Sequence, residues 1–188
     1  MKSALLITAT LLLLTLAAVG VLSFRRRTDA HLTGAITGKL RSMALGVTAP
    51  DAGIMVPDTP FGIWGVVADV GLSNGTATVV ALRDGTASLY LSSGGGIIGG
   101  ESHEGVRQAV AALLSAAEDA GSQFAPSSPQ ALPRTGHVRF YVHGRAGLLA
   151  SPEIADTQLT SGSAPLSPLF LTVNALITQF RAIPGAGA

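Results

Sequence analysis

The sequence contains no cysteine, which excludes disulfide bonds, thiolate metal ligands and a cysteine nucleophile. Charged residues are also scarce, at 12% of the 188 residues, whereas apolar residues make up 47%. Four of the twelve basic residues fall within the first 27 positions, so the rest of the chain has eight basic and eleven acidic residues. Nucleic-acid binding requires a basic face or stripe, and this balance argues against it.

Arrangements that would indicate catalysis are equally scarce. The spacing offers no plausible Ser/His/Asp arrangement and no general acid–base pair. Residues 34–40 (GAITGKL) are one residue short of a phosphate-binding loop, and no Ser or Thr follows Lys39. We therefore expect neither catalysis nor a bound cofactor.

What the chain does have is one long uncharged run, at residues 4–24, followed by Arg25, Arg26 and Arg27. As a helix this run would extend roughly 30 Å, the thickness of a bilayer core. A cleaved signal peptide would have a shorter apolar core and a cleavage site between small residues. The sequence thus favours an uncleaved transmembrane helix over a signal peptide.

The charges beside this run predict its orientation. Three arginines outweigh Lys2, so the positive-inside rule predicts a bacterial inner-membrane protein with its N-terminus outside and the remaining chain on the cytoplasmic side. The lipid bilayer and other integral membrane subunits would then be the partners. The predicted segments are an anchor with its basic flank (1–27), a juxtamembrane stalk (28–60), a cytoplasmic domain (61–183) and a tail (184–188).

The pattern of residues 61–183 predicts an α+β domain. Strands at 61–72, 76–83 and 87–93 are separated by Asn-Gly and Asp-Gly, which favour tight hairpin turns. An amphipathic helix follows from Ser102 to Gly121, then a strand pair from His137 onward and a last helix from Ser167. The order β-β-β-α-β-β-α predicts a two-layer fold, with one antiparallel sheet and both helices packed against it.

Three stretches carry a resemblance to a known group of proteins. They are SLYLSSGGGIIGGESHEGVR (88–107), HVRFYV (137–142) and PLSPLF (165–170). Together they resemble a family of small bacterial proteins with no established activity, over residues 66–181. With a membrane anchor, the chain is similar to small accessory subunits of bacterial membrane assemblies such as photosynthetic reaction-centre–antenna complexes. The resemblance implies an accessory role and carries over no catalytic residue.

The glycine-rich stretch has two interpretations. Gly94, Gly95 and Gly96 could present backbone N–H groups to an anion, and Glu101 with His103 could contribute to an ion site. Alternatively, the glycines form a bend between a strand and a packed helix. The spacing matches neither a dinucleotide fingerprint nor a metal-ligand pair, so we favour the bend and expect no metal site.

Two further groups of residues are candidate partner contacts. His137, Arg139, Tyr141 and His143 alternate along one strand, where they form either a polar binding face or, as we favour, the solvent face of a one-sided sheet. The other group lies at the N-terminus, and its members are small residues for helix packing and the basic flank: Ala17, Ala18, Gly20, Arg25, Arg26 and Arg27.

These observations favour a non-catalytic, single-pass membrane accessory subunit that docks on or bridges subunits of a larger complex. The alternative is a membrane-tethered sensor that binds a small molecule or ion at the glycine-rich loop. A concave pocket at that loop would favour the alternative, whereas a packed bend would favour the accessory subunit.

Overall fold

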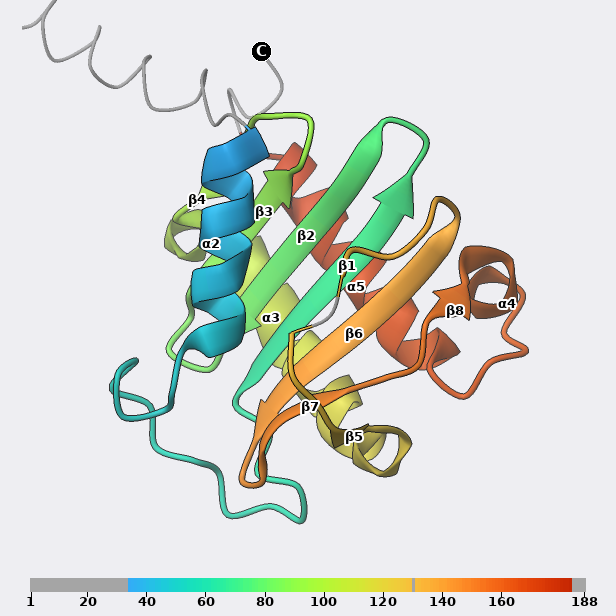
Figure 1. Ribbon diagram of the computed structural model, residues 1–188. Coiled ribbons are helices and arrows are strands. Elements are labelled where there is room, and N and C mark those ends of the chain that lie inside the picture. The colour runs from blue at the N-terminus through green and yellow to red at the C-terminus, as the bar shows by residue number, and fades with distance from the viewer. Residues whose placement is uncertain (1–33, 130, 184–188) are drawn as a thin grey trace, which may run out of the picture. The chain divides into compact units, whose positions relative to one another are not determined.

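A computed structural model describes residues 34–129 and 131–183 (Figure 1). Its helices and strands follow one another along the chain as α2 (Gly34–Gly46), β1 (Gly65–Leu72), β2 (Gly75–Leu82), β3 (Ala87–Leu91), β4 (Gly96–Ile98), α3 (Glu104–Asp119), β5 (Ala125–Pro126), β6 (His137–Gly144), β7 (Gly147–Ala150), β8 (Ile154–Ala155), α4 (Asp156–Thr160) and α5 (Ser167–Arg181). Short 3-10 turns at Gly100–Ser102 and Gly121–Gln123 flank α3.

The strands form one antiparallel sheet in the order β4-β3-β2-β1-β6-β7-β5, and β8 pairs with β6. The predicted meander is confirmed for β1, β2 and β3. Leu72 pairs with Gly75 across the first turn, where Gly75 has a φ of +139°. In the second turn the Asp84 carboxylate accepts hydrogen bonds from the backbone N–H and the hydroxyl of Thr86. The turn chemistry thus sets the register of the meander.

Helices α3 and α5 cover one face of the sheet, which Figure 1 shows with both helices behind the strands. Alternate residues of the central strands point toward them, including Val66 of β1 and Phe140 of β6, both fully buried. The helices contribute their apolar stripes, as the predicted periodicity requires. This is the larger core, and its members from the helices are Val106, Val110, Leu113, Leu114, Ala117, Leu169, Phe170, Val173, Leu176 and Phe180.

The opposite face of the sheet is covered by α2, which lies in front of the strands in Figure 1. A second core forms there around Val67 and Tyr141 of the sheet, Trp64 just before β1 and Leu45 of the helix. The domain therefore has three layers rather than the two predicted. The glycines of residues 34–46 lower helix propensity and favour a stalk, but packing of an apolar face on the sheet stabilises α2.

The fold class needs a correction at the N-terminus as well. Within the two described stretches, we find no helix with the length and apolar character needed to span a bilayer. The supported class is an α+β domain with an antiparallel sheet, and the described residues give no support to the transmembrane helix of the predicted fold class. The run at 4–24 on which it depended lies outside the described residues, as does the tail at 184–188.

Several short elements also depart from the predicted order. Strand β4 follows the glycine turn, β5 and β8 have two residues each, and α4 has five. Helix α3 begins at Glu104, with His103 rather than Ser102 at its N-cap position. Elements of two or three residues carry no detectable periodicity, which is why the sequence does not reveal them.

Candidate functional site

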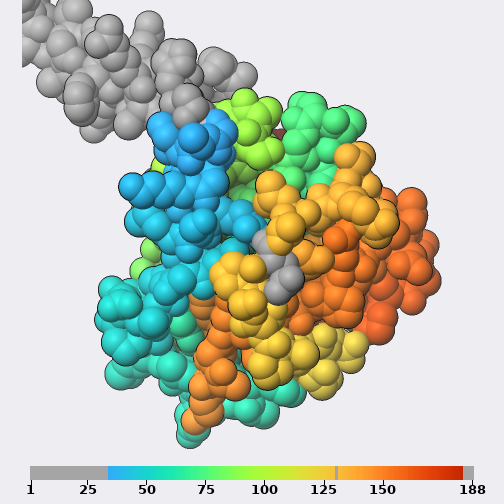
Figure 2. Space-filling model, in the orientation of Figure 1, coloured from blue at the N-terminus to red at the C-terminus, as the bar shows by residue number. Residues whose placement is uncertain are grey.

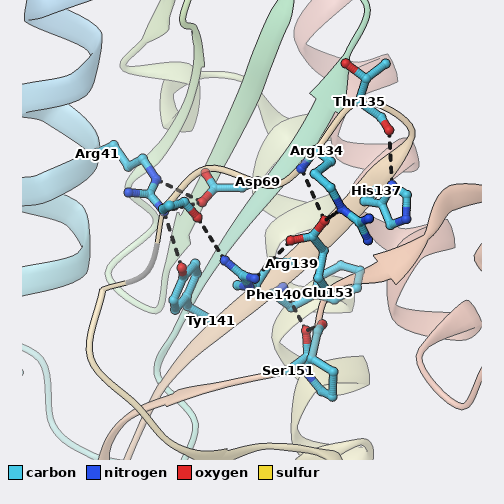
Figure 3. Close-up of polar contacts among 12 residues, drawn as sticks. Arg41, Asp69, Arg134, Thr135, His137, Arg139, Phe140, Tyr141, Ser151 and Glu153 are labelled. Carbon is cyan, nitrogen blue, oxygen red and sulfur yellow. Dashed lines mark hydrogen bonds and ion pairs between the residues drawn. The ribbon is translucent and has the colours of Figure 1, made fainter.

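A buried polar cluster lies between α2 and the sheet (Figure 3). The carboxylate of Asp69, which has no solvent exposure, accepts hydrogen bonds from Nε and Nη2 of Arg41 at 2.8 and 2.6 Å. It also accepts one from Oγ1 of Thr78 at 2.6 Å, on the neighbouring strand β2. Arg41 in turn donates to the hydroxyl of Tyr141 at 3.3 Å. A buried charge is tolerated only when paired in this way, so the cluster locks α2 onto the sheet.

A second ionic cluster lies beside it, around Arg139 of β6. Glu153 accepts from Nη2 of Arg139 at 3.0 Å and from Nε of Arg134 at 2.9 Å (Figure 3). Arg139 also donates to the carbonyl of Ala131 at 2.8 Å. The hydrogen bonds from Arg134 lower the pKa of Glu153, despite an opposing effect of desolvation. These contacts hold the loop before β6 against the sheet, just as the first cluster holds α2 there. Both clusters therefore have a structural role.

The four predicted residues of β6 do share one side of the strand, but that side is not a solvent face. Tyr141 is 0% exposed and His143 is 3% exposed, because α2 covers them. His137 contacts the carbonyl of Thr135, and Arg139 joins the second cluster. Our favoured interpretation of a one-sided sheet is therefore wrong. A partner reaches Tyr141 and His143 only if α2 leaves the sheet.

The other predicted partner contacts, Ala17, Ala18, Gly20 and the arginines at 25–27, lie outside the described residues. Their role in packing against a neighbouring helix or subunit stays a prediction.

The glycine-rich stretch forms a hairpin turn and the start of the next strand. Gly94 and Gly95 make the β3–β4 hairpin, in which Leu91 and Gly95 are joined by a backbone hydrogen bond of 3.1 Å. Gly96 then begins β4 opposite Tyr90, and a Cβ atom there would lie 2.3 Å from the carbonyl oxygen of Leu89. The glycines are thus required by positive φ angles and close backbone approach.

The acidic and histidine residues after this stretch are exposed. Glu101 lies in the 3-10 turn and His103 precedes α3. In the parts of the chain that the structure describes, no three His, Asp or Glu side chains are grouped so that they could hold a metal ion. Whether Gly94, Gly95, Gly96, Glu101 or His103 contacts a ligand stays a prediction.

The chain contains one Gly-x-Ser-x-Gly sequence, the spacing of a nucleophile elbow, at residues 71–75 (GLSNG), so an expectation that this motif is absent is wrong. An elbow places its serine in a turn from a strand to a helix. Here the turn joins two antiparallel strands, β1 and β2, and Ser73 is exposed at its tip. The motif is therefore a hairpin turn, in agreement with the Asn-Gly turn signal.

The outward side of α2 and the segment after it carry exposed apolar side chains. Four of the eight exposed large apolar residues of the described chain lie between positions 36 and 56. They are Ile36 at 43%, Met43 at 61%, Met55 at 87% and Val56 at 40%, and we call them the α2 face. Figure 2 shows α2 and the following segment covering one side of the molecule without interruption. The α2 face therefore presents apolar atoms to a potential partner.

His143 couples the stability of α2 to pH. Its Nε2 lies 2.8 Å from the carbonyl oxygen of Ala44 in α2, and its ring packs on Trp64 at 4.7 Å between centroids. Burial lowers the pKa of His143 more than the contact with that carbonyl raises it. Below the unfolded value of about 6.5, the unfolded chain binds this proton and the folded chain resists it, so stability falls as pH falls.

We therefore expect a lower melting temperature at a pH about one unit below 6.5 than at a pH about one unit above it. Thermal melts of the wild type, of His143→Gln and of the exposed-site control His103→Gln check this. The pH dependence should shrink only in His143→Gln. If the melting temperature of His143→Gln changes with pH as much as that of the wild type, other titratable groups cause the pH dependence.

Comparison with known proteins does not identify a family for this chain. The chain matches no protein-family model, and it shows no significant similarity to any curated protein or solved structure. The resemblance to a family of small bacterial proteins is therefore untested and stays a prediction.

Proposed function

We propose that the chain is a non-catalytic accessory subunit that docks on another protein of a larger complex through the α2 face. One observation carries the proposal: half of the exposed large apolar residues of the described chain lie in α2 and the segment that follows it, at positions 36–56. Single exposed apolar residues are common on protein surfaces, whereas their concentration in one exposed segment favours an interaction site. Two of the four are methionines, whose flexible thioether side chains adapt to a partner surface.

The support beneath the α2 face is consistent with this role. Arg41 is held by the buried carboxylate of Asp69, and the carbonyl of Ala44 is held by His143. Both contacts fix the helix from its inner side and leave its outer side free. A face that is already ordered loses less conformational entropy on binding, which favours affinity. Arg41 is turned inward, so Lys39 is the exposed charge of α2.

Site-specific photo-crosslinking of the full-length chain in its native cells tests the proposal. A photoreactive residue at Met43 should give one major adduct with a different protein, in the fraction of a large complex. The matched control is position 171, because Leu171 on α5 is 64% exposed and Met43 is 61% exposed. Adducts of equal yield at both positions, or with a second copy of the same chain, would contradict docking through the α2 face.

Charge substitutions give an independent measurement. Met43→Glu should release the chain from the complex in size separation, with binding weakened at least about tenfold, because burying an unpaired carboxylate costs more than about 1.4 kcal/mol. Leu171→Glu should leave the complex intact. Dissociation by both variants would indicate general destabilisation, which thermal melts of the isolated variants would show.

A further inference from the structure

A groove lies beside α3, on the face of the sheet opposite helix α2. It has a volume of about 630 Å³ and runs between α3, the β2–β3 turn and the segment at 57–63. Its floor is apolar and consists of Ile63, Val110 and Leu114, all buried. Seven of its thirteen lining residues are exposed, so the groove is open to solvent. Small-molecule sites enclose most of their ligand, whereas an open groove suits an extended chain that remains partly in solvent.

The groove is lined by unpaired side chains of opposite charge at its two ends. Arg83 and Arg107 stand at one end, and the guanidinium of Arg83 makes no hydrogen bond or ion pair with any described residue. Arg107 pairs with Glu104, but both side chains are about half exposed, so this pair contributes little. Asp119 lies at the other end and has no side-chain partner among the described residues. A bound segment would therefore find an unpaired cation at one end and an unpaired anion at the other.

The remaining carboxylates of the groove are already engaged. Glu118 accepts hydrogen bonds from the backbone N–H groups of Phe61 at 2.8 Å and Ile63 at 2.9 Å. Burial alone would raise the pKa of Glu118, but these hydrogen bonds outweigh it and lower the pKa. Asp84 is satisfied by Thr86 within its own turn. Glu118 thus fixes the wall of the groove in place, while Arg83 and Asp119 remain available.

The length of the groove sets the size of the occupant. The thirteen residues from Arg107 to Asp119 span about 18 Å along a helix, because each of the twelve steps between them adds about 1.5 Å. An extended peptide covers this distance with about five residues. We propose that the groove binds an extended segment of about five residues from another protein, with an acidic side chain beside Arg83, apolar side chains in the middle and a basic side chain beside Asp119.

An array of acetylated, amidated pentapeptides tests this site. Each peptide has Asp first, Lys last and all combinations of Ala, Val, Leu and Phe between them, and the probe is the labelled full-length protein. Peptides with Lys at both ends form the comparison set. Wild-type protein should bind members of the Asp/Lys set at least about tenfold more strongly than their Lys/Lys counterparts.

Variants then assign the binding to the groove. Arg83→Glu should weaken binding of the Asp/Lys peptides at least about tenfold and shift the preference toward the Lys/Lys set, since an acidic side chain then stands at each end of the groove. Arg181→Glu, the same charge change at an exposed position on α5, should bind like the wild type. Thermal melts confirm that both variants fold.

Two results would overturn the proposal: absence of saturable binding to any Asp/Lys peptide up to about 1 mM, or equal losses in Arg83→Glu and Arg181→Glu. Neither depends on the α2 face, because the groove and the helix lie on different sides of the sheet. Crosslinking from Met43 and peptide binding at Arg83 can therefore fail separately.

Discussion

Replacing Arg41 by alanine is expected to lower the free energy of unfolding by about 3–5 kcal/mol, because it leaves the carboxylate of Asp69 buried without its cation. Asp69 is fully buried, and the hydroxyl of Thr78 would still donate to it. Equilibrium denaturation of the wild type and the variant measures the difference. The control is Arg107→Ala, which breaks an ion pair between half-exposed side chains and should cost at most about 1 kcal/mol.

A double variant separates the buried charge from lost packing. Arg41→Met with Asp69→Leu removes both charges and keeps apolar volume, so it should be more stable than Arg41→Ala alone. If the double variant is instead the less stable of the two, the charge is not the main cause of the loss. In that case the packing of α2 on Tyr141 and Val67 would hold the helix, and the ion pair would set its position.

The cluster around Asp69 also shows where sequence patterns stop being informative. Arg41 and Asp69 are 28 residues apart, and Arg41 and Tyr141 are 100 residues apart. No local sequence pattern indicates that these residues make contact. Arg41 lies in a helix whose three glycines lower its helix propensity, and Asp69 is a single charged residue in an apolar strand. The isolated aspartate within a strand was the one available signal, because a buried carboxylate requires a distant partner.

The parts of the fold that were predicted correctly depend on short-range chemistry. The β1–β2–β3 meander follows from its Asn-Gly and Asp-Gly turns, and α3 and α5 follow from apolar residues at helical spacing. Helix α2 carries no comparable signal, because its stability comes from contacts with the sheet. The sequence allowed a short juxtamembrane helix at 31–46, but its packing on the sheet was not predicted, so the β6 face was expected to be exposed and the third layer was missed.

Replacing Phe180 by alanine should cost about 3–5 kcal/mol, because the ring is fully buried among α3, α5 and the turn before α3. Gly100, at the end of the glycine-rich stretch, packs against this ring so closely that a Cβ atom would lie 2.5 Å from it. Gly100→Ala should therefore destabilise the domain by about 1–3 kcal/mol through overpacking. Denaturation midpoints of both variants test these values.

Gly38→Ala is the matched control for the glycine substitution. Gly38 lies inside α2, and a Cβ atom there would meet no atom within 4 Å outside the backbone of its own helix, so alanine should stabilise the helix by up to about 1 kcal/mol. Combining Gly100→Ala with Phe180→Leu should cost less than the sum of the two single changes, because the smaller side chain makes room for the added methyl group. If the losses of unfolding free energy in the two single variants add up strictly in the double variant, the ring of Phe180 is not the reason that position 100 requires glycine. Gly100 alone would then need another reason, because Gly94, Gly95 and Gly96 are already required by their positive φ angles and close backbone approach.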